Sequence, residues 1–486
     1  MYKNLIFGNL FLFFSSLLGA REMSLEEKVG QLMVAPLCPT HRERHVEGLK
    51  RLVRERHVGG IIVMGGEAPL QQKLLAELQE GRELPLLTLQ DAEKGVGMRL
   101  KDVPPLPQNL TLGAVQDKDL LRAFGREVAR QCHAVGIMSP LAPVVDVNSN
   151  PSNPVIHQRS FGDDPHEVAE RGLAVMEGMR EGGVLSCVKH FPGHGDTAVD
   201  SHRGLPRIEK SLAEMSTLEL APFQRMIDAG VDMVMVGHLL FPALSPLPAT
   251  LSPEVMTHLL REEMGFKGLI VTDALNMSAL SARYGVEEEV MGAFQGGADL
   301  LLTATAYPVV SAFLIETGIP RAIDLLVEKC RTGEISEAEI DERVERILEV
   351  RKRMKKVEVE EDEELTQKLF DAAITVVGKP LVPLRRGEKV ALLQSSPDED
   401  LEALLGSSSD GEGSRVVVRY REGDSVSLIP EEAIILVLDT PYLLSQLPED
   451  RTILVGYEDR IEAKRALVQV LYGEKPPLGK LPVRIR

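Results

Sequence analysis

The chain has 486 residues, 44% of them hydrophobic and 4% aromatic, with no tryptophan and a formal net charge of −18. This length exceeds one ordinary domain, so we expect two. The acidic balance disfavours a nucleic-acid partner, because a phosphate backbone is bound by clustered lysine and arginine. The shortage of aromatic rings favours a small substrate held by polar contacts over a long polysaccharide. The four widely spaced cysteines predict single buried thiols rather than a disulfide framework or a zinc ribbon.

The N-terminal segment has a basic residue, a short apolar run over residues 5–18 and then two small residues. This pattern is typical of a signal peptide, and the run is short for a membrane span, which needs ~20 apolar residues. We therefore interpret residues 1–22 as a possible signal peptide and expect export to the periplasm or the medium. The alternative is a start at Met23 and a cytoplasmic protein. Ser24 and Glu27 have the spacing of a capping box and predict the beginning of the first helix.

Eight short apolar runs recur over the first two thirds of the chain, with helix-like stretches between them. Most runs are continuous rather than alternating, which suits strands buried on both faces of a parallel sheet. Eight strands alternating with helices over about 340 residues predict a (β/α)₈ barrel of the TIM type, which we place at residues 23–350. The predicted strands are residues 31–37, 60–64, 84–89, 137–145, 184–190, 231–237, 269–272 and 298–302, and the predicted helices include residues 119–134, 164–181, 211–229 and 253–263.

A change of composition follows the predicted barrel. Residues 351–371 are first basic and then acidic, which indicates a solvated, charged linker. Beyond it, residues 372–486 are predicted to form a smaller α/β domain. Its expected strands are residues 373–377, 389–393, 415–419, 433–438 and 452–455, and residues 406–414 form a loop by composition.

Polar residues stand at the ends of five predicted barrel strands or in the loops that follow them. In (β/α)₈ enzymes the active site lies at the carboxyl ends of the strands, where all eight meet on one face. One polar residue at a strand end is usually a cap or a turn residue, but five at separate ends favour a functional site. They are Asp91, Arg159, the pair Lys189 and His190, His238, and Asp273.

Residues 189–202 read K-H-F-P-G-H-G-D-T-A-V-D-S-H and place three of the 11 histidines in one loop with two aspartates. Functional residues collect on such loops. Asp200 and His202 are two positions apart, so a tight turn would let the carboxylate accept a hydrogen bond from the imidazole. That bond would fix the tautomer and raise the basicity of the other ring nitrogen. The alternative is a loop stapled by histidine–aspartate hydrogen bonds, but the density of titratable groups favours function.

This segment resembles the K-H-F-P-G-H-G-x-T-x-x-D-S-H signature of family 3 glycoside hydrolases. It is most similar to the branch of β-N-acetylglucosaminidases that trims peptidoglycan fragments. The resemblance covers residues 24–345 and, more loosely, residues 372–486, where G-K-L-P-V at 479–483 resembles the end of the family's second domain. It implies a retaining, exo-acting β-N-acetylhexosaminidase that acts on small saccharides and needs no cofactor or metal.

The family's roles carry over onto matching residues of this chain. Asp273, in I-V-T-D-A-L, is implied as the nucleophile, His202 as the acid/base group and Asp200 as the residue that orients it. The chemistry is consistent with this, because a histidine of ordinary pKa ~6.5 can serve as the proton donor where no second carboxylic acid is obvious. The implied sugar-binding residues are Asp91, Arg99, Arg159 (in R-S-F-G), Lys189 and His190.

One loop departs from the family pattern. The family has D-Q-E-G-G-R-V-x-R where this chain has D-A-E-K-G-V-G-M-R, so Lys94 replaces a glycine and Val96 replaces an arginine. The first aspartate and the last arginine of the loop remain, which preserves the pair Asp91 and Arg99. The two replacements put the shape of the loop between them in doubt.

Four other functions are consistent with parts of this pattern. A β-glucosidase or a β-N-acetylglucosaminide phosphorylase would use the same fold, and a sugar-binding barrel without catalysis would keep only the binding residues. A metal-dependent hydrolase could use His190, His194, His202 and Asp273 as ligands. Such barrels commonly carry H-x-H on the first strand, and residues 31–36 contain none.

Overall fold

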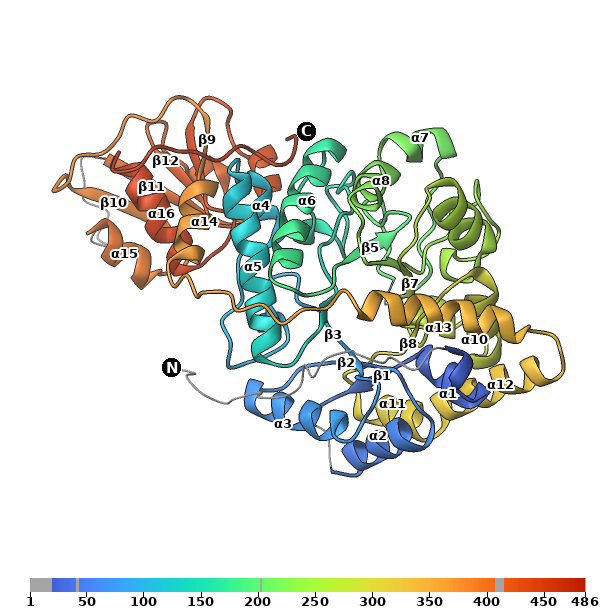
Figure 1. Ribbon diagram of the computed structural model, residues 1–486. Helices are drawn as coiled ribbons and strands as arrows, with labels where there is room; N and C mark the ends of the chain where they lie inside the picture. Colours follow the sequence, from blue (N-terminus) through green and yellow to red (C-terminus); the bar gives the residue numbers. More distant parts are fainter. Residues whose placement is uncertain (1–19, 41–42, 202, 407–414, 486) are drawn as a thin grey trace.

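The structure is a computed structural model that describes residues 20–40, 43–201, 203–406 and 415–485 (Figure 1). The apolar run over residues 5–18 lies outside these ranges, so the predicted signal peptide stays a prediction. The capping box is confirmed: the Ser24 side chain accepts from the Glu27 N–H, and the Glu27 carboxylate accepts from the Ser24 N–H. Within the described part of the chain, no helix combines the length and the apolar character that a membrane crossing requires.

Eight parallel strands form the predicted barrel. One sheet has the order β4-β3-β2-β1-β8 and another the order β5-β6-β7. Parallel bridges between Val144 and Lys189 and between Val271 and Leu300 join the two sheets at both seams and close the ring. The strands are β1 (Met33–Leu37), β2 (Gly60–Val63), β3 (Leu87–Gln90), β4 (Ser139–Pro140), β5 (Cys187–Phe191), β6 (Met233–Val236), β7 (Leu269–Thr272) and β8 (Leu301–Leu302).

All residues of these eight strands are buried, as expected for a barrel whose strands face side chains inside and helices outside. The predicted strand at residues 137–145 is reduced to Ser139–Pro140. Proline has no N–H to donate, so Pro140 and Pro143 prevent a longer ladder.

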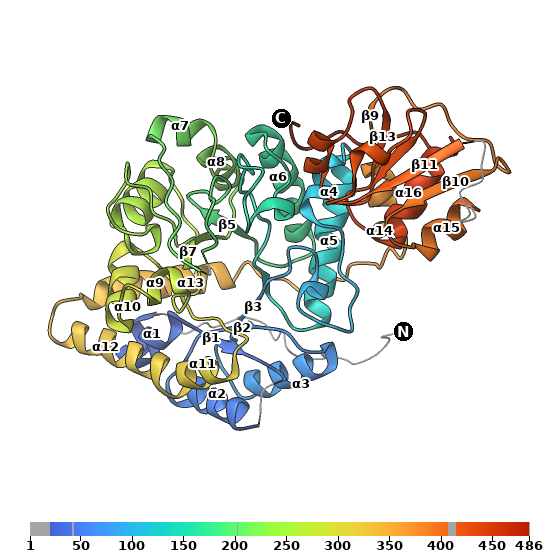
Figure 2. The ribbon, with the colours of Figure 1, turned by 180° about the vertical axis from the view of Figure 1, so that it is seen from behind.

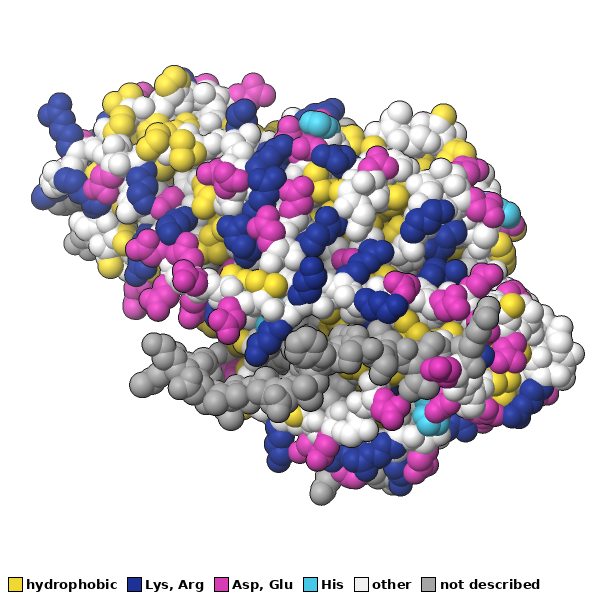
Figure 3. Space-filling model, in the orientation of Figure 1, with side chains coloured by type: hydrophobic (Ala, Val, Ile, Leu, Met, Phe, Trp, Pro, Cys, Tyr) yellow, Lys and Arg dark blue, Asp and Glu magenta, His cyan; other side chains and the backbone are white. Residues whose placement is uncertain are grey.

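Helices surround the barrel, and two of them are bound to each other by ion pairs. They are α1 (Leu25–Gln31), α2 (Glu43–Glu55), α3 (Ala68–Gln79), α4 (Asn109–Ala114), α5 (Lys118–Ala134), α6 (Pro165–Glu181), α7 (Leu212–Thr217), α8 (Leu220–Asp228), α9 (Ser278–Ser281), α10 (Val286–Gly296), α11 (Pro308–Phe313), α12 (Ile319–Arg331) and α13 (Glu337–Arg351). Between α5 and α6 the pairs are Lys118–Glu170, Arg122–Glu177 and Arg126–Glu181, at 2.6, 2.8 and 2.7 Å. Figure 3 shows the resulting mixture of acidic and basic side chains on this face.

Two predicted helices differ from the structure. The helix expected at residues 211–229 is interrupted at Leu218, because Pro222 has no N–H to donate to the Leu218 carbonyl oxygen and its ring would clash with that oxygen. Glu219, at the break, is buried and pairs with Lys210. Residues Glu254–Glu263 form a π-helix, η5, rather than an α-helix. Shorter turns are η1 (Ala20–Glu22), η2 (Val96–Met98), η3 (His157–Arg159), η4 (Ala249–Leu251), η6 (Leu314–Gly318), η7 (Val426–Leu428) and η8 (Pro441–Gln446).

The C-terminal domain is a five-stranded sheet of order β10-β11-β12-β13-β9, in which β9 runs antiparallel to β13. Its elements are β9 (Thr375–Gly378), β10 (Val390–Gln394), β11 (Arg415–Tyr420), β12 (Ile434–Val437) and β13 (Thr452–Val455), with α14 (Leu365–Ala373), α15 (Glu399–Leu405) and α16 (Ile461–Leu471). This is the predicted smaller α/β domain. Helix α14 occupies the second part of the expected linker 351–371, and Figures 1 and 2 show it beside α4 and α5.

The four cysteines are free. Cys38, Cys132 and Cys187 are buried, as predicted, and Cys330 is partly exposed.

Candidate active site

The sugar-binding residues predicted from the strand ends lie together in the structure. Lys189 belongs to β5, Asp91 directly follows β3, and Arg159 ends η3 in the long segment after β4. The ammonium nitrogen of Lys189 lies 2.8 Å from Asp91 Oδ1 and 2.8 Å from Glu93 Oε1. Arg99 pairs with the other oxygen of Asp91. Lysine therefore bridges two carboxylates at the carboxyl end of the barrel.

Arg159 extends this arrangement toward His190. Its Nε and Nη2 donate to the two carboxylate oxygens of Glu93 at 3.0 and 2.7 Å. Nη2 also lies 3.2 Å from Nε2 of His190. Two parallel hydrogen bonds fix the plane of a guanidinium as well as its position. Glu93 was not among the predicted binding residues, yet it pairs with both Lys189 and Arg159.

Asp146 is a second residue that the sequence prediction missed. It is completely buried, and its Oδ2 accepts from the His190 ring Nδ1 at 2.7 Å and from the His190 N–H at 3.1 Å. Its Oδ1 accepts from the His194 N–H at 2.7 Å. With Nδ1 held by Asp146, the His190 ring turns Nε2 toward the guanidinium of Arg159.

We call the joined set the charged cluster: Asp91, Glu93, Arg99, Asp146, Arg159, Lys189 and His190. Burial alone would raise the pKa of the Asp91 carboxyl, but Lys189 and Arg99 outweigh it and hold this pKa well below its ordinary value. In the same way, Arg159 and Lys189 lower the pKa of Glu93 to about 2 against the effect of burial. The carboxylates are therefore ionised and compensated, the condition under which buried charge is tolerated.

Asp273, the predicted nucleophile, directly follows β7 and is half-buried. Its Oδ1 accepts from the Ala274 N–H at 2.7 Å. Burial would raise the pKa of this carboxyl, but His238, His190 and Lys189 act against it, and the pKa lies below its ordinary value. His238 is fixed nearby, with Nε2 2.8 Å from the Ala274 carbonyl oxygen. Asp273 is thus ionised, within electrostatic reach of the charged cluster.

Residues 192–210, here called the histidine loop, continue from β5. His194 is buried, and its Nδ1 and Nε2 lie 2.9 and 3.1 Å from the hydroxyls of Thr197 and Ser201. Burial lowers the pKa of His194 to about 4, so its ring is neutral at pH 7. Asp200 is partly exposed. His202 lies outside the described residues, so the pairing of Asp200 with His202 stays a prediction.

The loop that departs from the family pattern still brings Asp91 and Arg99 together. Val96 is buried, and its N–H donates to Gln131 Oε1 at 3.1 Å. Gly95 has φ +71°, and a Cβ there would come within 2.3 Å of the same glutamine oxygen. Valine at position 96 therefore packs into the barrel shell, and the neighbouring glycine permits the turn.

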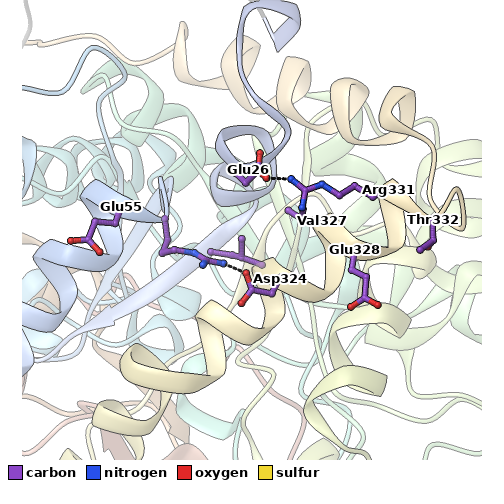
Figure 4. A pocket seen from close by; sticks show the side chains of 9 residues that line it. Glu26, Glu55, Asp324, Val327, Glu328, Arg331 and Thr332 are labelled. Atoms are coloured by element: carbon purple, nitrogen blue, oxygen red, sulfur yellow. Dashed lines mark hydrogen bonds and ion pairs between the residues drawn. The ribbon is translucent and has the colours of Figure 1, made fainter.

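The metal-ligand set considered above is not assembled in the part of the chain that the structure describes, where no group of three or more potential ligands is found. Both ring nitrogens of His194 face hydroxyls instead. A cavity of about 430 Å³ lies elsewhere, between α1, α2 and α12. The ion pairs Glu26–Arg331 and Arg56–Asp324 line it, and it contains none of the site residues. Figure 4 shows Glu26 and Arg331 turned toward each other.

Comparison with known proteins decides the family. A sequence model of the glycosyl hydrolase family 3 N terminal domain matches residues 24–350. The chain belongs to glycoside hydrolase family 3. The family resemblance of the 189–202 segment is thereby confirmed, and the chain is a glycoside hydrolase.

Several relatives are β-hexosaminidases by name. Beta-hexosaminidase A of Pseudoalteromonas piscicida is 34% identical over 284 residues, which cover 53% of this chain and 48% of that protein. This chain thus spans about half of that relative's length. Beta-hexosaminidase LpqI of Mycobacterium tuberculosis is 34% identical over 340 residues, which cover 67% of this chain and 82% of that protein.

Solved structures agree with this placement. A glycoside hydrolase family 3 β-N-acetylglucosaminidase from Paenibacillus sp. str. FPU-7 aligns with a TM-score of 0.79 and 31% identity, covering 95% of this chain and 99% of that one. The structure of M tuberculosis LpqI aligns with a TM-score of 0.60 and 30% identity, covering 69% of this chain and 97% of that one. The barrel followed by a smaller α/β domain is therefore an arrangement found in this family.

Proposed function

We propose that this chain is an exo-acting β-N-acetylhexosaminidase that removes terminal β-linked N-acetylglucosamine from small saccharides derived from peptidoglycan. The β-hexosaminidase relatives and the β-N-acetylglucosaminidase structure support the hexosaminidase activity. The observation that carries the proposal is the ionised, half-buried Asp273 beside a compensated cluster of polar side chains that can hold the hydroxyls of one sugar.

A retaining mechanism follows from these groups. The carboxylate of Asp273 attacks the anomeric carbon and forms a glycosyl-enzyme ester, while the leaving oxygen takes a proton from protonated His202. Neutral His202 then takes a proton from water, whose oxygen attacks the same carbon and releases the Asp273 carboxylate. Asp200 orients the imidazole and favours its protonated form in the first step.

Histidine is the better candidate for the acid because two other carboxylates considered for this role, Glu93 and Asp196, already pair with cations. Glu93, with a pKa of about 2, is ionised at neutral pH and pairs with Lys189 and Arg159. Oδ2 of Asp196, on the histidine loop, lies 2.9 Å from the ammonium nitrogen of Lys210. Glu93 therefore carries no proton to donate at pH 7, and Asp196 is paired with a lysine, which supports the assignment of this role to His202.

A panel of chromogenic β-glycosides tests the activity. We expect kcat/KM to be highest for the N-acetylglucosaminide, ahead of the glucoside and the xyloside, with rates independent of added phosphate. A preference for the glucoside would identify a β-glucosidase. Acceleration by phosphate with release of a sugar 1-phosphate would identify a phosphorylase. Saccharide binding without turnover would leave a non-catalytic sugar-binding barrel.

The nucleophile has its own test. Asp273→Ala should lower kcat by roughly 10³-fold or more, because no covalent intermediate can form. The melting temperature should change little, since the Asp273 carboxylate bonds to its neighbour Ala274. A fluorinated trapping glycoside should label Asp273 in the unmodified enzyme. Mass spectrometry that locates the label on another carboxylate would contradict the assignment.

Peptidoglycan fragments as the natural substrate agree with export, which we propose on the apolar run over residues 5–18. N-terminal sequencing of the protein from its native source decides this point. A mature chain that begins near residue 21 supports export. An intact Met1 or a start at Met23 would contradict it and indicate a cytoplasmic enzyme.

A further inference from the structure

The site residues described above all belong to the barrel, yet the C-terminal domain contacts the barrel next to one of them. Figures 1 and 2 show this domain against α4 and α5, with the end of the described chain beside α6. Three separate contacts cross between the domains here, and each lies on or next to the segment that carries Arg159.

The first contact is made by Tyr442, on η8. The amide nitrogen of Asn148 donates to the Tyr442 hydroxyl oxygen at 2.6 Å, and the Tyr442 ring lies 5.2 Å from the ring of His157, centroid to centroid. Asn148 is completely buried, and its Oδ1 accepts from the His157 N–H at 3.1 Å. His157 begins the short turn that Arg159 ends. One tyrosine thus holds the segment at two points before Arg159.

The second contact is made by Glu458, which is buried. Its Oε1 accepts from the Gln108 N–H at 2.8 Å and from the Thr111 hydroxyl at 2.6 Å, at the beginning of α4. From the same helix, the side-chain amide of Asn109 donates to the carbonyl oxygen of Arg159 at 2.7 Å. Glu458 therefore reaches the backbone of Arg159 through α4.

The third contact lies just beyond Arg159. The Asp163 N–H donates to the carbonyl oxygen of Pro482 at 3.1 Å, and the Arg484 N–H donates to Asp163 Oδ2 at 2.9 Å. A Cβ at Gly162 would come within 2.2 Å of the Pro482 oxygen, so the approach requires glycine. The segment is thus held on the far side of Arg159 as well.

We propose that the C-terminal domain positions Arg159, with Tyr442 and Glu458 as positioning residues, and so sets the affinity of the barrel for its sugar. Arg159 forms two parallel bonds to Glu93 and faces His190, a geometry that a shift of about half an ångström spoils. The inference rests on the proposed role of Arg159 in sugar binding. It assigns to the C-terminal domain a function in the barrel's own site.

Tyr442→Phe is the first test, because it removes the hydroxyl that accepts from Asn148 and keeps the ring against His157. We expect KM for the N-acetylglucosaminide to rise three- to tenfold with kcat within twofold, the size typical of residues that act through a neighbour. Tyr472→Phe is the matched control. Its hydroxyl donates to the Leu405 carbonyl oxygen at 2.9 Å within the C-terminal domain, and its loss should leave KM unchanged.

Glu458 supplies an independent test with a conservative rescue. Glu458→Gln keeps an oxygen that can accept from Gln108 and Thr111, so KM should stay within twofold of the parent value. Glu458→Ala removes that oxygen and should raise KM as Tyr442→Phe does. Melting temperatures are recorded for every variant, so that a change of KM is separated from a loss of folded protein.

A double-mutant cycle with Arg159→Lys tests whether Tyr442 acts through Arg159. In that background, Tyr442→Phe should change KM by less than twofold. Where turnover is too slow, the Kd for N-acetylglucosamine from calorimetry replaces KM. An unchanged KM in Tyr442→Phe, an equal rise in Tyr472→Phe, or the full effect persisting in Arg159→Lys would each overturn the proposal.

The unsubstituted enzyme keeps this test separate from that of the proposed function. If it does not cleave the N-acetylglucosaminide, the proposed function fails. The Tyr442, Tyr472 and Glu458 comparisons are then made on whichever β-glycoside of the panel it does cleave.

Discussion

The charged cluster and the histidine loop lie at the same end of the barrel but are held in different ways. In the cluster, Lys189 is buried and bridges two ionised carboxylates. In the loop, neutral His194 holds two hydroxyls, and the side chains of Val199 and Asp200 are 47% and 27% exposed. Groups that bind a sugar need one position, whereas an acid/base group serves a leaving oxygen and then a water. The difference in attachment agrees with the proposed roles, which are sugar binding for the charged cluster and acid/base catalysis for His202.

The largest expected effect is on turnover, when the predicted acid/base residue of the loop, His202, is replaced. His202→Ala should slow substrates with poor leaving groups by on the order of 10²–10⁴-fold, the usual contribution of a general acid. Activated aryl glycosides need little protonation, so their glycosylation step should be almost unaffected. The measurement is kcat/KM for a series of substrates that differ in leaving-group pKa. In His202→Ala, kcat/KM should fall more steeply with rising leaving-group pKa than in the parent enzyme.

The controls for His202 use a small anion and its predicted partner. Azide should restore deglycosylation in His202→Ala by replacing the activated water, and the product should be a glycosyl azide. Asp200→Ala should give the same pattern more weakly, because Asp200 orients and tunes the imidazole. An equal loss on all leaving groups without azide rescue would reduce His202 to a structural role.

The next largest effect is on stability, and it compares one lysine of the charged cluster with one lysine of the loop. Lys189→Met leaves Asp91 and Glu93 buried without their shared cation and should lower the free energy of unfolding by about 3–5 kcal/mol. Lys210→Met should cost less than about 2 kcal/mol, because burial already raises the pKa of its partner Glu219, which can take up a proton. Urea unfolding of both variants measures the difference. Equal losses would contradict the contrast between cluster and loop.

The smallest effect is the response of the loop to acid. Burial lowers the pKa of His194 from its ordinary 6.5 to about 4, so between these values the folded state binds fewer protons than the unfolded state. This contribution is complete above pH 6.5 and is lost as pH falls toward 4, by up to about 3 kcal/mol. His194→Gln should flatten the dependence of unfolding free energy on pH in this window. His166→Gln, at an exposed position on α6, should leave it as steep as in the parent.

The architecture was predictable because most barrel strands lie in continuous, buried and largely apolar runs. The errors arose where one local feature competed with that pattern. Pro140 and Pro143 remove ladder donors from the strand expected at 137–145, and Pro222 interrupts the helix expected at 211–229. Each proline acts through its missing N–H and its ring, and apolar periodicity alone reports neither.

The site was predictable where a residue follows a strand directly. Asp91 and Asp273 satisfy that rule. Asp146 satisfies it too, because it directly follows the predicted strand at 137–145, but the residue predicted from that loop is Arg159, farther along the chain. Glu93 could not be selected in this way. Only the folded turn brings it back to Lys189 and Arg159, and nothing in its spacing from Asp91 indicates those two partners.

The contact between Asp163 and Arg484 also bears on the order of events during synthesis. The two residues are 321 positions apart, so the loop is made long before the segment that secures it. Domains fold as units, and the N-terminal one folds first while the ribosome is still adding residues. The barrel therefore folds before the contacts that hold the Arg159 segment from the C-terminal domain can form. If the C-terminal domain positions Arg159 as proposed, a newly made barrel folds before it reaches its full affinity for sugar.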